Sequence, residues 1–214
     1  MGVDLRSELP PVRDQGQSPC CVAFALTAVH ENGASVERLS EASLFDTCKR
    51  VDGLPADSGT TIDAAVWALE AWGQCRAEDW PLGSTPPAAL RFAAGLDVPD
   101  CSRQCLLKPH ETSTSNLIAA LDARKPIGVV VQLTREFYRA QKGRVALAVG
   151  DEAIPARHAL VLVGYDFTGS TSDGDFIFRN SWGSAWGERG YGHATFGYIE
   201  RWVAPSGVVF DRAL

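Results

Sequence analysis

The chain has 214 residues, of which 45% are hydrophobic, and a formal net charge of −6. This length allows one domain or two closely packed lobes, and the hydrophobic content is enough for a real core. The modest negative charge gives no reason to expect a nucleic-acid partner. No apolar stretch is long enough to span a membrane, and residues 1–5 are too short and too polar to form a signal peptide.

The first half of the chain is predicted to be helical. Apolar residues recur at helical spacing in the segments 22–34, 40–50, 60–73 and 113–125. Ser40 is suited to cap the second helix, and Thr60 or Thr61 the third. Residues 51–59 are predicted to form a loop. Residues 74–110 contain many Pro and Gly residues and are predicted to be largely irregular.

The second half is predicted to be rich in strands. Residues 127–133 follow Pro126 and are short and β-branched, as in a buried strand. Further candidate strands are 143–149, 159–165, 175–180 and 191–196, with a helical turn at 135–141. Helices first and strands later indicate an α+β protein with two segregated lobes, divided near residues 108–112.

One short stretch carries reactive chemistry. Residues 15–19 form a turn that ends in Pro19 and leads directly into the helix of residues 22–34. Cys20 or Cys21 therefore lies in the first helical turn, next to unpaired N–H groups and the positive end of the helix dipole. This setting lowers a thiol pKa and favours the reactive thiolate. Cys20 is interpreted as a buried structural thiol, and Cys21 as the nucleophile.

A nucleophilic thiolate also needs a base, a group that orients the base and donors for an oxyanion. His158 begins one apolar run and Asn180 ends another. Papain and the cathepsins have this order, with His and Asn roughly 130–150 residues after the Cys. Taken singly, the three residues have ordinary structural interpretations: a buried thiol, a core histidine and a turn asparagine.

Three motifs together resemble the papain family of cysteine peptidases. Gln15 lies six residues before Cys21, which is the family's spacing between oxyanion glutamine and nucleophile. Residues 157–165 resemble the family's histidine motif, and residues 179–191 resemble its asparagine motif closely. The resemblance covers nearly the whole chain.

The resemblance implies a papain-like two-lobe fold. A helical lobe of approximately residues 10–110 would carry the cysteine, and an antiparallel, β-barrel-like lobe of residues 111–214 would carry the histidine and asparagine. Residues 1–9 would join the lobes, and the active-site cleft would lie between them.

The resemblance also implies a cysteine endopeptidase that uses no cofactor or metal and acts on protein or peptide substrates. Cys21 would attack as a thiolate paired with the His158 imidazolium, Asn180 would orient the imidazole, and Gln15 would serve the oxyanion hole. Trp182 would cover the His–Asn contact. The walls of the main specificity pocket would be Gly59, Thr60, Thr61 and Ile62 on one side, with Val130 and Ala159 on the other.

Several positions depart from the family's pattern. Val22 replaces the usual Trp after the nucleophile, Pro19 replaces a Gly, and Ser18 replaces a cysteine that normally forms a disulfide. Thr60 replaces the second Gly of the pocket and should narrow it. These changes indicate a divergent branch of the family with an altered cleft, and the absence of a prosegment favours a bacterial-type member. Because the residues of the pocket walls are small or apolar, we expect an apolar or medium-sized side chain two residues before the cleaved bond.

The other cysteines do not decide whether the protein works in an oxidising or a reducing compartment. Cys48 could pair with Cys101 or Cys105, Cys101 could pair with Cys105, and a zinc site lacks histidines at ligand spacing. A reducing or mixed compartment is favoured. The chain starts as mature papain-type enzymes start, without the family's prosegment. We therefore expect a cytoplasmic enzyme or a delivered toxin domain, the latter with a proteinaceous inhibitor or immunity protein as partner.

Two other functions use the same residues. A thiol amidase, deamidase or acyltransferase would keep the same Cys, His and Asn residues, and only the walls of its cleft would differ from those of a peptidase. An inactive homologue would serve as a binding module, but such a protein commonly loses one member of the set.

Overall fold

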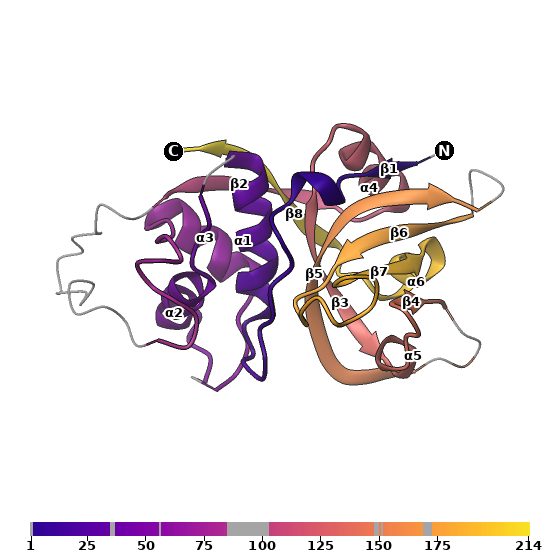
Figure 1. Cartoon of the computed structure of the whole chain (residues 1–214), viewed down its shortest axis with the longest axis horizontal. Helices are drawn as coiled ribbons and strands as arrows, with labels where there is room; N and C mark the ends of the chain where they lie inside the picture. The colour runs from indigo at the N-terminus through magenta and orange to yellow at the C-terminus, as the bar shows by residue number, and fades with distance from the viewer. Residues whose placement is uncertain are drawn as a thin grey trace.

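In a computed structural model of the protein, the described residues are 2–34, 37–55, 57–84, 103–147, 150, 152–168 and 173–214. Figure 1 shows a group of helices gathered in one lobe and a twisted sheet with further short helices in the other. This arrangement is the α+β, two-lobe plan that the order of predicted elements implies.

The helical lobe consists of α1 (Cys21–Ala34), α2 (Glu41–Val51) and α3 (Ile62–Ala71). The Ser40 hydroxyl accepts a hydrogen bond from Ser43 N at 3.0 Å, and the Thr61 hydroxyl accepts one from Ala64 N at 3.1 Å. Both side chains therefore cap their helices as predicted. Residues 22–31 of α1 are buried on every side of the helix, as expected of a central helix between other layers.

The β lobe is built on one sheet of eight strands in the order β2-β8-β3-β5-β6-β7-β4, with β1 paired to β5. The strands are β1 (Val3–Asp4), β2 (Cys105–Glu111), β3 (Ile127–Thr134), β4 (Arg144–Val145), β5 (Ala153–Phe167), β6 (Gly174–Arg179), β7 (Tyr191–Thr195) and β8 (Ser206–Ala213). Only the short β4–β7 pair is parallel. The helical elements on this side are η1 (Arg6–Glu8), α4 (Thr114–Asp122), α5 (Arg135–Tyr138) and α6 (Phe196–Trp202).

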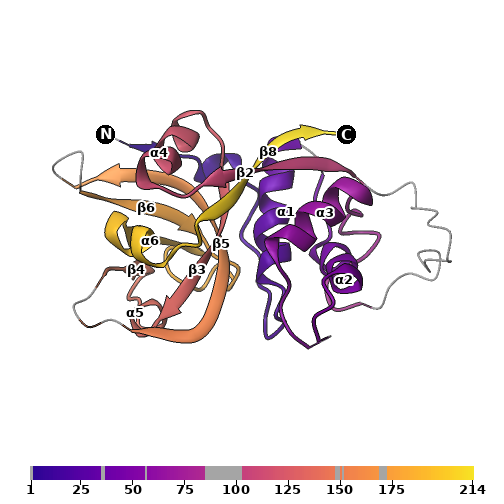
Figure 2. The same cartoon turned by 180° about the vertical axis from the view of Figure 1, so that it is seen from behind.

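A two-stranded ribbon connects the lobes. Strands β2 and β8 pair antiparallel along their whole length, from Cys105 opposite Ala213 to Glu111 opposite Ser206. Figure 2 shows this ribbon running from the sheet across α1 and α3. The N-terminus lies on the sheet side and the C-terminus over the helices (Figure 1). The proposed division into residues 10–110 and 111–214 stays a prediction, and the ribbon belongs to both lobes.

Several predicted boundaries are wrong. Residues 105–111 form strand β2 and are not irregular. The fourth helix ends at Asp122, before the predicted Lys125, because Arg124 adopts a left-handed conformation with φ of 58°. The candidate strand 143–149 is reduced to Arg144–Val145, and its residues 148–149 lie outside the described part of the chain.

Cys48 and Cys105 are both fully buried free thiols, so the suggested bond between them does not form. Burial raises the pKa of each thiol to about 12. Cys101 lies outside the described residues. No helix in the described part of the chain combines the length and apolar character needed to cross a bilayer.

Candidate active site

Cys21 is the first residue of α1, directly after the turn that ends in Pro19. The neighbouring Cys20 is 1% exposed, whereas Cys21 is half-buried, so Cys21 is the more accessible of the two residues. The backbone N–H of Ala159 donates toward the Cys21 thiol. Ala159 follows His158 in β5, so the thiol faces the strand that carries the predicted base.

The pKa of the Cys21 thiol differs from the sequence expectation. Burial raises it, and the N–H groups of Ala159, Val22 and Cys21 itself offset that effect only in part. The helix start therefore acts in the expected direction, but the loss of water contact outweighs it. Burial therefore works against the thiolate form of Cys21.

His158 and Asn180 are joined by a hydrogen bond. The His158 Nε2 to Asn180 Oδ1 distance is 2.7 Å, and Ser181 N donates to the same oxygen at 2.8 Å. Because the Ser181 N–H requires an acceptor, the oxygen assignment of the amide is supported from two sides. Asn180 Oδ1 can only accept, so Nε2 of His158 carries the proton and Nδ1 is left with a lone pair.

The environment of His158 also favours its neutral form. The residue is 4% exposed, and burial lowers its pKa to about 4 although the Asn180 contact acts in the opposite direction. An ion pair with Cys21 would have to gain more from mutual attraction than both groups lose on leaving water.

Aromatic rings enclose the His–Asn contact. The Trp182 indole lies 4.8 Å from the His158 ring, centroid to centroid, and Tyr138 stacks on Trp182 at 5.9 Å. Phe137 is 1% exposed and lies 6.1 Å from the His158 ring and 5.6 Å from Trp182. These rings therefore shelter the imidazole from water.

Gln15 is held by the loop that carries Asn180. Ser181 Oγ donates to Gln15 Oε1 at 2.5 Å, and Gln15 N donates to Ser181 O at 2.9 Å. The amide nitrogen of Gln15 donates to Ser18 O at 2.7 Å. A primary amide has two N–H bonds, so one donor remains for another acceptor near the Cys21 turn.

The predicted pocket residues fall into two groups. Val130 and Ala159 are directly paired across β3 and β5, so their side chains share one face of the sheet. Gly59 approaches the Cys21 turn so closely that a Cβ there would lie 3.3 Å from Pro19 O. Thr60 and Ile62 are half-buried and flank Thr61, the exposed cap of α3.

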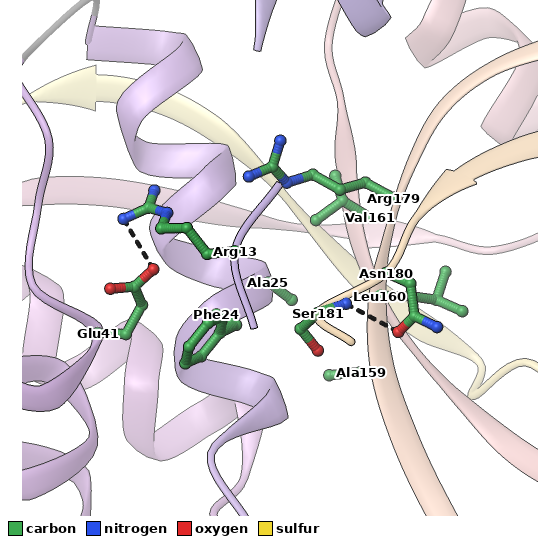
Figure 3. Close-up of a pocket in the computed structure, with 10 residues that line it drawn as sticks. All are labelled: Arg13, Phe24, Ala25, Glu41, Ala159, Leu160, Val161, Arg179, Asn180 and Ser181. Atoms are coloured by element: carbon green, nitrogen blue, oxygen red, sulfur yellow. Dashed lines mark hydrogen bonds and ion pairs between the residues drawn. The ribbon is translucent and has the colours of Figure 1, made fainter. Parts of the chain in front are cut away.

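Buried charges lie beneath the site. Arg13 contacts the carboxylates of Glu31 and Glu41, the latter at 2.7 Å, and its side chain is 11% exposed. Figure 3 shows Arg13 and Glu41 on the α1 side of a small void and Asn180 and Ser181 on the β5 side. This void is about 10 Å³, roughly the space of one water molecule.

Arg179 N–H groups donate to the carbonyls of Pro10 and Pro11, which fixes the segment leading to Gln15.

Sequence reasoning missed two residues that shape this site, Ser181 and Tyr138. The signal for Ser181 was its position after Asn180, and Tyr138 could have been noted within the predicted helical turn. In the described part of the chain, no three His, Cys, Asp or Glu side chains come together as metal ligands.

The fold and this site define a two-lobe α+β protein that brings a cysteine, a histidine and an asparagine to the junction of its lobes. A sequence profile described as papain family cysteine protease matches residues 1–200, and the chain belongs to this family.

Among curated proteins, mouse cathepsin J is 27% identical over 199 residues, which is 88% of this chain and 58% of cathepsin J. The chain thus spans under two thirds of the length of that relative. Cysteine proteinase B of Leishmania mexicana is 29% identical over 213 residues, with 91% of this chain and 44% of the relative covered.

Among solved structures, xylellain, a cysteine protease from Xylella fastidiosa, aligns over 97% of this chain and 85% of its own, with a TM-score of 0.76 and 25% identity. This similarity supports the expected bacterial-type member. The Carica candamarcensis protease CMS1MS2, solved in complex with E-64, has a TM-score of 0.69 and 20% identity, with 99% of this chain and 98% of its own covered. At that identity the match supports the fold alone.

Proposed function

We propose that the protein is a cysteine endopeptidase in which Cys21 is the nucleophile, His158 the general base and acid, Asn180 the orienting group and Gln15 an oxyanion donor. The 2.7 Å bond from His158 Nε2 to Asn180 Oδ1 carries the proposal, because it leaves Nδ1 unprotonated. Ala159, the next residue in β5, donates its N–H toward the Cys21 thiol. Base and nucleophile are therefore neighbours.

The resting pair is neutral, so the proton moves when the substrate arrives. His158 Nδ1 takes the thiol proton as sulfur attacks the carbonyl carbon, and a tetrahedral intermediate forms. The imidazolium then gives that proton to the leaving amine, and the acyl-enzyme remains. Water attacks the acyl group with His158 again as base, which releases the acid product and restores the thiol.

The oxyanion is stabilised by the free N–H of the Gln15 amide and by the backbone N–H of Cys21. Loss of one such donor typically lowers the rate about 10²–10³-fold. Ser181 holds the Gln15 amide oxygen, so the nitrogen end is already oriented before a substrate binds. Donors fixed in advance cost no reorganisation during the reaction.

The pocket walls favour an apolar or medium-sized side chain two residues before the cleaved bond. Val130 and Ala159 share one face of the β3–β5 pair and offer methyl groups. The Thr60 and Ile62 side chains would bound the opposite side next to Gly59. A charged side chain would lose hydration there without gaining a partner.

The decisive experiment labels the thiol with the epoxide E-64 at pH 6–7 and weighs the intact protein. Wild type and Cys20→Ala should each gain one adduct, and Cys21→Ala none. The labelled site is then tested on a folded protein substrate. New termini support an endopeptidase, a mass gain of about one dalton per deamidated residue supports a deamidase, and a transferred acyl group supports an acyltransferase.

Equal, slow labelling of all thiols in the wild type would contradict the proposal and favour the inactive binding module. Delivery as a toxin domain, with an immunity protein as partner, stays a prediction. A pull-down with Cys21→Ala from the source organism's lysate, followed by a test of whether the captured protein blocks E-64 labelling, would address it.

A further inference from the structure

Lys49 in the last turn of α2 is a nearly buried cation with three partners. Its ammonium group donates to Asp52 Oδ2 at 3.1 Å, Ser58 Oγ at 3.3 Å and Gly59 O at 3.1 Å. The Lys49 side chain is 12% exposed and that of Asp52 is 1% exposed. An ammonium group has three N–H donors, so every donor of Lys49 is used.

Asp52 is fixed in turn. Leu54 N donates to its other oxygen at 2.9 Å. Burial acts to raise the pKa of Asp52, but the hydrogen bonds from Leu54 N and Lys49, together with the nearby Thr60 hydroxyl, outweigh it and lower the pKa overall. The carboxylate is therefore charged at neutral pH and holds the Lys49 ammonium in place.

This cluster ends at the predicted cleft wall. Gly59, whose carbonyl binds Lys49, packs against Pro19, two residues before Cys21. At the far end of the same segment, Thr61 caps α3. Within the described residues, no backbone carbonyl accepts a hydrogen bond from the Gly59 or Thr60 N–H group. Backbone N–H groups of this kind pair with extended peptides in other proteins.

A purely structural role would give Lys49 different partners. A lysine in the last helical turn commonly stabilises the helix through its own terminal carbonyls and dipole. Here one bond goes to the carboxylate that ends α2, and the other two go to the segment beside the nucleophile. The Lys49 ammonium group therefore holds the segment of Ser58 and Gly59 as well as the end of its own helix.

We propose that Lys49 is a positioning residue that holds the Gly59–Thr60 backbone in place. An extended peptide substrate binds along this backbone on the acyl side of the cleaved bond. This inference rests on the proposed peptidase function. It assigns substrate alignment to a buried Lys49–Asp52 pair and leaves the chemistry of Cys21 to the other residues.

The test compares two substrates in the variant Lys49→Met, which keeps the length and the apolar stem but removes the charge. One substrate is a peptide with three residues before the cleaved bond, and the other is an ester of a single acylated amino acid. We expect roughly a tenfold loss of kcat/KM on the peptide, mainly through a higher KM. The ester and iodoacetamide alkylation of Cys21 should change less than about twofold.

Lys108→Met is the matched control, because Lys108 is 61% exposed and bonds Asp211 across the ribbon of β2 and β8. It should leave both substrates unaffected. Ser58→Ala removes a single acceptor and provides a milder variant should Lys49→Met fold poorly, with a smaller loss again confined to the peptide. Equal losses on both substrates, or none on either, would overturn the inference. Wild type that turns over neither substrate would instead refute the proposed function.

Discussion

The two lobes hold their halves of the site by different means. Beneath Cys21, the helical lobe uses buried charges, with Arg13 between two carboxylates and Lys49 beside Asp52. Around His158, the β lobe uses strand pairing and stacked rings centred on Phe137. Charged networks depend on pH and fail when one partner is removed, whereas ring packing depends on volume and is independent of pH. Substitutions that cost the same free energy of unfolding at neutral pH should therefore differ between the two lobes in how that cost changes with pH.

The largest effect is expected from Phe137→Ala in the β lobe. Phe137 contacts the rings of His158, Trp182 and Trp186, so its loss leaves a cavity at the base side of the site. We expect a loss of about 3–5 kcal/mol in the free energy of unfolding and little residual activity. Urea unfolding at several pH values above about 6.5, where His158 is neutral in the folded and the unfolded protein, should show the same loss at each. Tyr138→Ala, an aromatic that is 60% exposed, should change stability far less.

Arg13→Met should cost a similar amount at neutral pH, about 3–5 kcal/mol, because it leaves Glu31 and Glu41 buried without a cation. Burial raises the pKa of Glu41, and Arg13 is the main group that opposes this. In the variant the folded protein binds a proton more readily than the unfolded chain. The cost should therefore shrink as pH falls, and urea unfolding at pH 5 and pH 7 measures it.

Arg50→Met is the control for Arg13→Met, because Arg50 pairs with Asp46 at 2.7 Å in side chains that are 43% and 30% exposed. Its effect should stay below about 1 kcal/mol. A pH-independent loss in Arg13→Met would remove the distinction between the lobes.

His30 should make the helical lobe sensitive to mild acid. It is 1% exposed, its Nδ1 bonds Gln74 Oε1 at 3.1 Å, and burial lowers its pKa to about 4. Between pH 6.5 and 4 the unfolded chain binds the extra proton, so stability is complete above about pH 6.5 and is lost as pH falls, by about 3 kcal/mol in total from this group. His158 acts in the same direction.

His30→Leu tests this, because it removes one titrating group from the helical lobe and leaves His158 unchanged. The slope of unfolding free energy against pH in this window should fall by about 1.4 kcal/mol per pH unit. An unchanged slope would show that His30 does not titrate in the folded state as its surroundings require.

The smallest effect is expected where the lobes meet, at Ser181→Ala. The variant loses the 2.5 Å bond that holds the Gln15 amide, and Gln15 can then turn. A single neutral hydrogen bond is worth about 1 kcal/mol, so kcat should fall about fivefold with KM nearly unchanged. Ser184→Ala, exposed in the same loop, serves as control. A change in KM alone would mean that Gln15 does not serve the oxyanion.

Local signals in the sequence predict the helical lobe well. The hydroxyls of Ser40 and Thr61 lie at the positions where helix patterns begin, and both cap their helices. The spacing of Gln15 from Cys21 follows from the turn before α1, which is equally local. These features depend on neighbours within a few residues, so the chain itself specifies them.

Contacts between distant segments could not be predicted in the same way. β2 contains Pro109 and follows a segment rich in Pro and Gly, and it is a strand only because β8 pairs with it. The rise in the pKa of the Cys21 thiol could not be predicted for a related reason. The sequence reveals the helix start, but the burial that outweighs it arises only in the folded chain.

Helix α1, which carries Cys21, packs against strand β8 of the ribbon, and β8 is synthesised after all the other helices and strands in the described part of the chain. Gly33 in α1 leaves room for Phe210 of β8, and a Cβ at Gly33 would lie 2.0 Å from that ring. A chain emerging from the ribosome can form α1, α2 and α3 early, but this face of α1 stays uncovered until Phe210 has been synthesised. Strands β5 and β6 exist by then. Thiol, imidazole and amide therefore reach their final places together, only after β8 has been synthesised.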